Sequence, residues 1–379
     1  MVQSSMEHIG QAQFTRNRRQ ALDKLVEGAI RRKVFPGMEL LVARGDNVLL
    51  HEAWGQMELG PEALPMRAGT IFDIASITKP MSTATLAMIL VERGELGMED
   101  KVADYFPQYA TAEKKGIALR HLLTHTSGLP DWADLHSESA TPADALQRLL
   151  NVGLSHPTGT AMVYSDLGYL LLGEIIRRHE EKSLGECFHR YIAHPLGLAQ
   201  TTFNPLAGDE EGDTDLSTIA PTQYCPYRQK LLRGTVHDEN AFAFGGEAGN
   251  AGLFSTAADM HRFARMVLNG GALEGTRLLA RRTVEMMTVN HNPVRLAPRG
   301  LGWDIKGDHL GYASCGALMQ KGAIGHTGFT GTSLWMEPGT GLTVILLTNR
   351  VHISRDSNQA DMIRFRPRLH NLVVTLFSE

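Results

Sequence analysis

A serine and a lysine three residues apart, Ser76 and Lys79, form the pair in this sequence with the clearest capacity for chemistry. They stand at the start of an apolar run, residues 81–91, which predicts a buried helix. Residues three apart share one face of a helix, so the hydroxyl and the amine would be neighbours. A desolvated amine, whose pKa falls, can take the hydroxyl proton and make serine a nucleophile. Pro80 fits the first turn, where no helical hydrogen bond is lost.

Two further segments could complete such a site. Tyr164 lies between a turn at 157–160 and a predicted helix, where its phenol could act as a base beside a cationic lysine. His326 opens the segment 326–329, whose glycines let the backbone approach a ligand closely. Each segment alone has a structural interpretation as well: a helix start, a half-buried core tyrosine and a glycine-rich strand edge. The functional hypothesis therefore depends on all three together.

Composition narrows the class of protein. The chain has 379 residues, 43% of them hydrophobic, which is enough for a large core and two lobes. A net charge of −4 argues against a nucleic-acid partner. Cys187, Cys225 and Cys315 are far apart and odd in number, which predicts free or buried thiols. No stretch reaches the roughly 20 apolar residues of a membrane span. Because the N-terminus has no apolar signal-peptide core, we predict a cytoplasmic protein.

The order of predicted elements suggests one sheet built from both ends of the chain. We predict an α+β fold, in which terminal helices flank an antiparallel sheet that joins a mostly helical lobe. The sheet-containing lobe would comprise residues 1–72 and 237–379, the helical lobe residues 73–236, with the site at their interface. The predicted elements are helices over 14–33, 143–150, 167–179, 255–268 and 360–377, and strands over 38–43, 47–54, 331–337 and 342–349.

Three motifs in this order, Ser76-x-x-Lys79, Tyr164-x-Asp166 and His326-Thr327-Gly328, resemble the penicillin-recognising serine hydrolases. That superfamily, with its β-lactamase/transpeptidase-like fold, includes class C β-lactamases, D-Ala-D-Ala carboxypeptidases and the β-lactamase-like carboxylesterases of family VIII. A related serine–lysine signature marks class A β-lactamases and penicillin-binding proteins. The resemblance runs from about Gly37 to Asn349 and includes the flanking segments 72–75, 119–129, 169–176 and 325–332.

The resemblance implies a role for each matching residue. Ser76 would be the acylated nucleophile, and either Lys79 or Tyr164 would be the base in a shared proton transfer. The backbone amides of Ser76 and Phe329 would form the oxyanion hole. No metal or organic cofactor is implied. The residues that would hold the substrate are Asp166, His326, Thr327, Gly328 and Phe329.

Two positions depart from the β-lactamase pattern. Asp166 stands where lactamases have asparagine, and an ionised aspartate accepts hydrogen bonds but donates none. Its charge would also favour a protonated Lys79. His326 stands where lactamases have lysine, and a histidine is largely neutral at pH 7. Both changes should weaken binding of carboxylate-bearing substrates at these positions, which favours an esterase over a resistance β-lactamase.

Other polar segments have weaker functional interpretations. His121 and His125 are spaced to share a helical face, but no acidic residue is placed as in H-E-x-x-H, so we predict no metal site. The segment 237–240 could line the cleft or form a solvated loop.

The sequence thus predicts a serine hydrolase that works through an acyl-enzyme on Ser76. The favoured activity is a carboxylesterase on short acyl esters. A D-amino-acid peptidase, a carboxypeptidase or a weak β-lactamase is the alternative within this class. A penicillin-binding sensor or a scaffold is the non-enzymatic alternative. The partner would be a small ester, amide or β-lactam.

Overall fold

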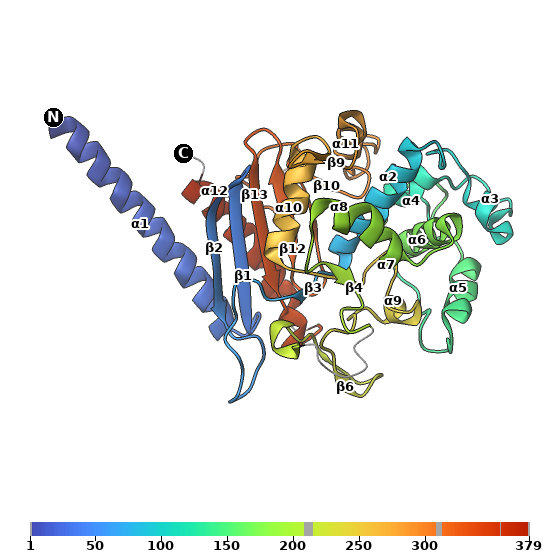
Figure 1. Cartoon of the computed structure of the whole chain (residues 1–379), viewed down its shortest axis with the longest axis horizontal. Coiled ribbons are helices and arrows are strands. Elements are labelled where there is room, and N and C mark those ends of the chain that lie inside the picture. The colour runs from blue at the N-terminus through green and yellow to red at the C-terminus, as the bar shows by residue number, and fades with distance from the viewer. Residues whose placement is uncertain (1, 208–214, 308–312, 357, 378–379) are drawn as a thin grey trace.

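A computed structural model describes residues 2–207, 215–307, 313–356 and 358–377, and it contains one large antiparallel sheet (Figure 1). The strand order is β10-β11-β12-β13-β1-β2. β1 pairs with β13, placing Met38 opposite Thr348 and Arg44 opposite Leu342. The sheet is therefore built from both ends of the chain, which confirms the predicted fold class. The strands are β1 Gly37–Arg44, β2 Asn47–Gly55, β10 Asp304–Ile305, β11 Ile324–Thr327, β12 Ser333–Glu337 and β13 Leu342–Thr348.

The four predicted strands are present and form two hairpins, β1 with β2 and β12 with β13. Gly45, between β1 and β2, has φ +56, and Gly341, between β12 and β13, has φ +73. Glycine adopts this left-handed backbone without a steric penalty, so it can close both turns. The amide of Gly45 also donates to the carbonyl of Gly341 at 3.0 Å, which ties the two turns together.

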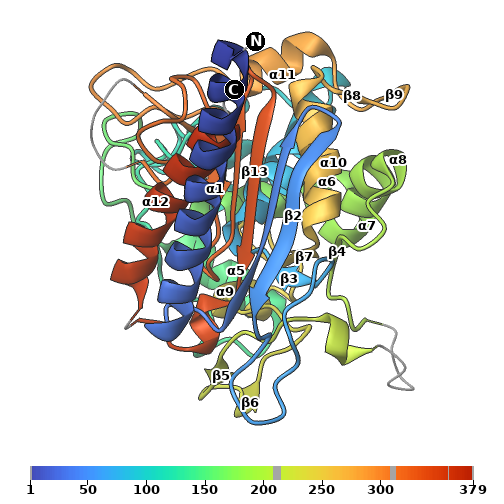
Figure 2. The same ribbon diagram turned by 90° about the vertical axis from the view of Figure 1, so that its left-hand side faces the viewer.

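Helices cover both faces of this sheet. α1 Val2–Arg31 and α12 Gln359–Phe377 lie side by side on one face, and α10 Ala257–Leu268 packs on the other (Figure 2). Successive residues of a strand point to opposite faces. Leu40 of β1 accordingly joins the core under α1 and α12, whereas Leu41 joins the core to which α10 contributes. This double burial explains why the β1 residues from Gly37 to Ala43 are all buried and, apart from Glu39, apolar rather than alternating.

The predicted terminal helices are present with shifted starts. α1 begins at Val2, earlier than the predicted residue 14, and the intervening residues include no proline, so nothing in them interrupts the helix. α10 begins after Thr256, whose hydroxyl accepts from the amide of Asp259 at 3.3 Å and so caps the helix.

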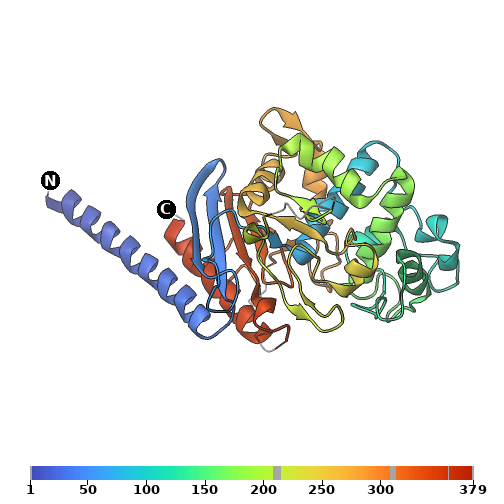
Figure 3. The same ribbon diagram turned by 60° about the horizontal axis from the view of Figure 1, so that its bottom comes forward.

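Most of the remaining helices lie beyond the sheet, on the side away from α1 and α12 (Figures 1 and 3). They are α2 Thr85–Glu92, α3 Val102–Tyr105, α4 Leu119–Leu123, α5 Pro142–Asn151, α6 Asp166–Glu180, α7 Leu184–Phe188, α8 His194–Leu196, α9 Glu239–Ala243 and α11 Arg281–Met287. A small sheet has the strand order β3 Phe72–Asp73, β7 Leu253–Ser255 and β4 Thr202–Phe203. Its strand β3 comes directly before the Ser76 turn in the chain. Two short ribbons pair β5 Tyr224–Cys225 with β6 Lys230–Leu231, and β8 Ala272–Leu273 with β9 Thr276–Arg277. The lobe boundaries at 72/73 and 236/237 stay a prediction.

Cys187, Cys225 and Cys315 are free and buried, as predicted. Within the described ranges, none of the helices combines the length and apolar character that crossing a bilayer requires.

Leu40→Ala tests the core beneath α1 and α12. Leu40 is fully buried, so the substitution should lower the free energy of unfolding by about 2–5 kcal/mol through lost burial and a residual cavity. Val48→Ala on exposed β2 is the control and should change it by less than about 1 kcal/mol. Urea denaturation measures the free energy of unfolding of both variants. Equal losses in the two would contradict the position of this core.

Candidate active site

Ser76 is presented by a strained turn that a buried carboxylate holds. Ala75, just before it, has φ 48, a conformation that costs a non-glycine residue about 1–3 kcal/mol. Asp73 Oδ1 accepts from the amide of Ala75 at 2.8 Å, and its Oδ2 accepts from the amide of His237 at 2.7 Å. The Thr330 hydroxyl donates to the Asp73 carbonyl at 2.8 Å. Burial raises the pKa of Asp73 to about 6, although both amides oppose the shift. Asp73 thus fixes the serine turn to the segment that begins at His237.

The helix after this turn carries Lys79 directly beneath Ser76. The chain passes through a 3-10 turn, Ala75–Ile77, and a π-helical stretch, Lys79–Ala84, before α2 begins. The prediction of a helix from Ser76 onward is therefore correct, but its first turns are irregular. Such π-helical turns often occur at functional sites.

Lys79 is fully buried and makes three hydrogen bonds. Its Nζ donates to Ser76 Oγ at 3.0 Å, to Asp166 Oδ1 at 2.6 Å and to the Asn250 carbonyl at 2.9 Å. An ammonium has three protons, so every one has an acceptor. Burial acts to lower the pKa of Lys79, but its interactions with Asp166, and then with Tyr164, outweigh this effect, and the pKa is raised. The expectation of an amine with a lowered pKa is therefore wrong, because Asp166 stabilises the ammonium.

Tyr164 lies two residues before the start of α6 and completes the cluster with Ser76 and Lys79. Its hydroxyl is buried and makes no hydrogen bond of normal geometry with any described residue. Interactions with Lys79 and Ser76 nevertheless act to lower the pKa of this phenol. The Lys79 Nζ lies 5.0 Å from the ring centroid. Burial raises the pKa of Tyr164, and the opposing effect of Lys79 is smaller. The phenol is thus neutral at rest, contrary to the expected ease of proton loss.

His125 supports the Tyr164 loop rather than a metal. Its ring stacks on that of Tyr164, with centroids 4.5 Å apart, and its Nδ1 accepts from the amide of Ser165 at 3.0 Å. His121 Nδ1 likewise accepts from the amide of Ala118 at 3.0 Å. Both histidines therefore use a ring nitrogen to hold the backbone.

His326 lies on β11, buried behind the cavity wall. Its Nδ1 donates to the Thr327 carbonyl at 2.8 Å, so in the neutral ring Nε2 has a free lone pair. Burial, followed by the charges of Lys79 and Arg299, holds the pKa of His326 well below its ordinary value. The imidazole is neutral, as expected, and supplies no cation at this strand.

Gly328 brings the end of β11 against the Ser76 turn. A Cβ at this position would lie 2.1 Å from Thr332 Oγ1 and 2.5 Å from the Ile74 carbonyl, so only glycine fits. The Gly328 amide already donates to the Thr332 carbonyl at 2.8 Å. The next amide along the chain is that of Phe329, which lies beside the cavity.

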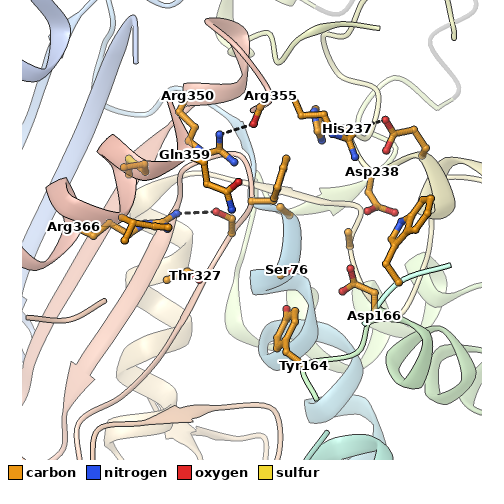
Figure 4. A pocket seen from close by; sticks show the side chains of 18 residues that line it. Ser76, Tyr164, Asp166, His237, Asp238, Thr327, Arg350, Arg355, Gln359 and Arg366 are labelled. Atoms are coloured by element: carbon orange, nitrogen blue, oxygen red, sulfur yellow. Dashed lines mark hydrogen bonds and ion pairs between the residues drawn. The ribbon is translucent and has the colours of Figure 1, made fainter. Parts of the chain in front are cut away.

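These residues surround a cavity of about 290 Å³ (Figure 4). Six of the eight predicted site residues line it, whereas Lys79 and His326 are buried behind them. The six are Ser76, Tyr164, Asp166, Thr327, Gly328 and Phe329.

The structure also adds residues that the sequence analysis did not assign to the site. His237, Asp238 and Glu239 line the cavity, so the first interpretation of 237–240, that it lines the cleft, is confirmed, and the solvated loop is wrong. Figure 4 shows Asp166 and Asp238 on one side and three arginines, Arg350, Arg355 and Arg366, on the other. Asp73 and Asn250 do not line the cavity, but they accept hydrogen bonds from the Ala75 amide and from Lys79. A polar residue beside a motif, such as Asp73 before Ser76, was the one available signal.

The β-lactamase family profile matches residues 22–365 of this chain. The chain belongs to the β-lactamase family. A protein of Escherichia coli (strain K12), named as a candidate D-alanyl-D-alanine carboxypeptidase, is 30% identical over 348 residues, which cover 84% of this chain and 79% of that one. An N-acetylmuramyl-L-alanine amidase of Bacillus subtilis (strain 168) is 32% identical over 372 residues, covering 90% and 83%.

Solved structures show the same fold. The hydrolase EstCE1, described as having promiscuous acyltransferase activity, superposes with a TM-score of 0.73 at 21% identity, over 96% of this chain and 99% of that one. A penicillin-binding protein homologue from Caulobacter crescentus gives a TM-score of 0.72 at 20% identity, over 95% and 98%. With the sequence relatives, these results identify the chain as a serine hydrolase of the β-lactamase family.

Asp166→Asn tests the electrostatic origin of the Lys79 ammonium. Without the Asp166 charge, burial meets less opposition, so the pKa of Lys79 should fall below its wild-type value. Carbon-13 NMR of the labelled lysine ε-carbon, titrated with pH, measures the shift. Glu174→Gln removes the same charge from an ion pair with Arg177 on α6 that does not line the cavity, and it should leave the pKa of Lys79 in place. An unchanged pKa in Asp166→Asn would show that another group sustains the ammonium.

Proposed function

We propose that this serine hydrolase cleaves carboxyl esters of short acyl groups through an acyl-enzyme on Ser76. The observation that carries the proposal is the 3.0 Å contact of Ser76 Oγ with Lys79 Nζ at the wall of the cavity. Ser76 Oγ would attack the ester carbonyl, and the amides of Ser76 and Phe329 would stabilise the oxyanion. The alcohol would leave with a proton, and water would then release the acid.

The resting protonation state determines how the reaction can start. Lys79 is an ammonium and Tyr164 a phenol, so either becomes a base only after it loses a proton. The shortest hydrogen bond of Lys79, at 2.6 Å, leads to Asp166 Oδ1, so this carboxylate stabilises the ammonium, and the proton would be lost to solvent as the pH rises. Either residue could then take the Ser76 proton, and they would share its delivery to the leaving alcohol.

The cavity supports a small acyl substrate. Its volume of about 290 Å³ lies at the lower limit of the range for ligand pockets, about 300–1,000 Å³. His326 is neutral, so no fixed cation stands on β11 where a β-lactam carboxylate would need one. These two features favour esters over penicillins.

Amide hydrolysis is the second candidate, as in a D-amino-acid carboxypeptidase or an amidase. It is favoured by the names of the relatives at 30% and 32% identity. Comparing p-nitrophenyl butyrate, D-alanyl-D-alanine and nitrocefin separates the activities. A penicillin-binding sensor would give one burst of acylation and then stop, whereas a hydrolase continues to turn over.

Ser76→Ala should abolish turnover of p-nitrophenyl butyrate, lowering kcat by about 10³-fold or more. Ser82→Ala is a matched control, because Ser82 is buried in the same helical segment and its Oγ has no hydrogen-bond partner among the described residues. Steady-state kinetics measures both variants. Full activity in Ser76→Ala would exclude Ser76 as the nucleophile.

Ester hydrolysis should increase with pH through mildly alkaline values. The raised pKa of Lys79 keeps the amine protonated at neutral pH, and only the deprotonated amine can act as a base. In Asp166→Asn the rise should move to lower pH, since the pKa of Lys79 falls. Profiles of kcat/KM from about pH 5 to about pH 9 test both statements. A flat wild-type profile would contradict the proposed proton path.

A further inference from the structure

Arg350 is a buried cation at the edge of the cavity. It comes directly after the residue that follows β13, at the start of the 3-10 turn Arg350–His352, and only 3% of its surface is exposed. It lines the cavity, and its guanidinium lies 4.6 Å from the centroid of the Phe329 ring (Figure 4). Phe329 supplies the proposed second oxyanion amide. Arg350 therefore lines the same cavity as Ser76 and the residue of that proposed amide.

The charge of Arg350 has no carboxylate partner in the described part of the chain. One nitrogen, Nη1, donates to the Arg355 carbonyl at 2.9 Å and to Asn358 Oδ1 at 3.0 Å, and both acceptors are uncharged. Burial lowers the pKa of Arg350 to about 10, and the exposed Asp356 offsets only part of this effect. By contrast, Arg355 forms an ion pair with Glu239.

A buried guanidinium without a counter-ion is unfavourable, and buried charges are normally paired. The guanidinium fork matches the two oxygens of a carboxylate, and it is more weakly hydrated than an ammonium. A ligand that brings a carboxylate into the cavity would supply the missing charge. The same guanidinium is held in place by the Phe329 ring and by two hydrogen bonds, so little freedom is lost on binding.

We propose that Arg350 determines specificity by binding a carboxylate of the substrate, so that the preferred substrates are acyl compounds with a free carboxylate. This inference rests on the proposed acyl-enzyme function. It changes the expectation drawn from His326, which concerned only the cation that β11 lacks. The fixed cation comes instead from the segment after β13.

The alternative role for Arg350 is structural, because Nη1 holds the segment 350–358 together. Two substrate pairs distinguish the roles. The first pairs the mono-p-nitrophenyl ester of glutarate with that of glutaramate, which places the carboxylate on the acyl side. The second pairs 3-acetoxybenzoate with 3-acetoxybenzamide, which places it on the leaving group. Each pair differs only in a carboxylate against a neutral amide.

Wild-type protein should prefer the carboxylate in at least one pair. Arg350→Gln should lower that preference, measured as the ratio of kcat/KM values, by roughly 10-fold or more. Arg350→Lys should retain part of it, since the charge remains. Arg177→Gln is the control, because it removes an equal charge from an exposed pair on α6 that does not line the cavity. Its ratio should equal that of the wild type.

The structural alternative predicts a different result. Asn358→Ala removes an acceptor of the Arg350 clamp and leaves the charge. If it lowers the preference as much as Arg350→Gln does, or if the ratio in Arg350→Gln equals that of the wild type, the proposal is wrong.

A binding measurement tests the role of Arg350 even if the protein turns over none of the esters. If wild-type protein hydrolyses none of the four esters, the ester function fails, and calorimetry with 3-carboxyphenylboronic acid and phenylboronic acid then decides the role of Arg350. A preference for the carboxylated boronate that Arg350→Gln removes supports the carboxylate site. Equal affinities in the wild type overturn it.

Discussion

The buried ammonium of Lys79 is the interaction on which the site depends. It binds three parts of the chain at once: the Ser76 turn, Asp166 at the start of α6 and the Asn250 carbonyl before β7. A charge inside a protein is tolerated only when its protons have acceptors. The sequence meets this requirement by placing a carboxylate where lactamases have a neutral amide. The consequence is a resting site in which each proton of the Lys79 ammonium has an acceptor.

The surrounding fold brings these partners together. The six-stranded sheet presents β11, and Gly328 lets the end of that strand approach the serine turn. On the other side, Asp73 ties the turn to the segment that begins at His237. The strained backbone of Ala75 is thus held between two rigid supports, as expected where a nucleophile must be presented in one orientation. The contacts that hold these parts of the fold together therefore also fix the orientation of Ser76.

Much of this arrangement could be predicted from local sequence. The residue pattern predicted strands at β1, β2, β12 and β13, and the apolar periodicity predicted α5, α6 and α10. Three spaced motifs located Ser76, Tyr164 and Asp166, which the structure brings to one cavity. Their catalytic roles stay a prediction. The expected lowered pKa of Lys79 and the expected easier proton loss from Tyr164 were wrong, because each depends on how burial and neighbouring charges balance in the folded protein. The expectation that Asp166 favours a protonated Lys79 was confirmed. Arg350 was not found, since nothing in its sequence neighbours shows that the segment after β13 returns to the serine.

The most direct test of the central claim, that these side chains converge on one reactive hydroxyl, is a crystal structure of the protein after reaction with an alkyl fluorophosphonate. We expect phosphorus bonded to Ser76 Oγ, with its oxygen between the amides of Ser76 and Phe329 and with Lys79 and Tyr164 beside the modified serine. Phosphorus on another residue, or an adduct on Ser76 whose oxygen points away from both amides, would contradict the proposed site.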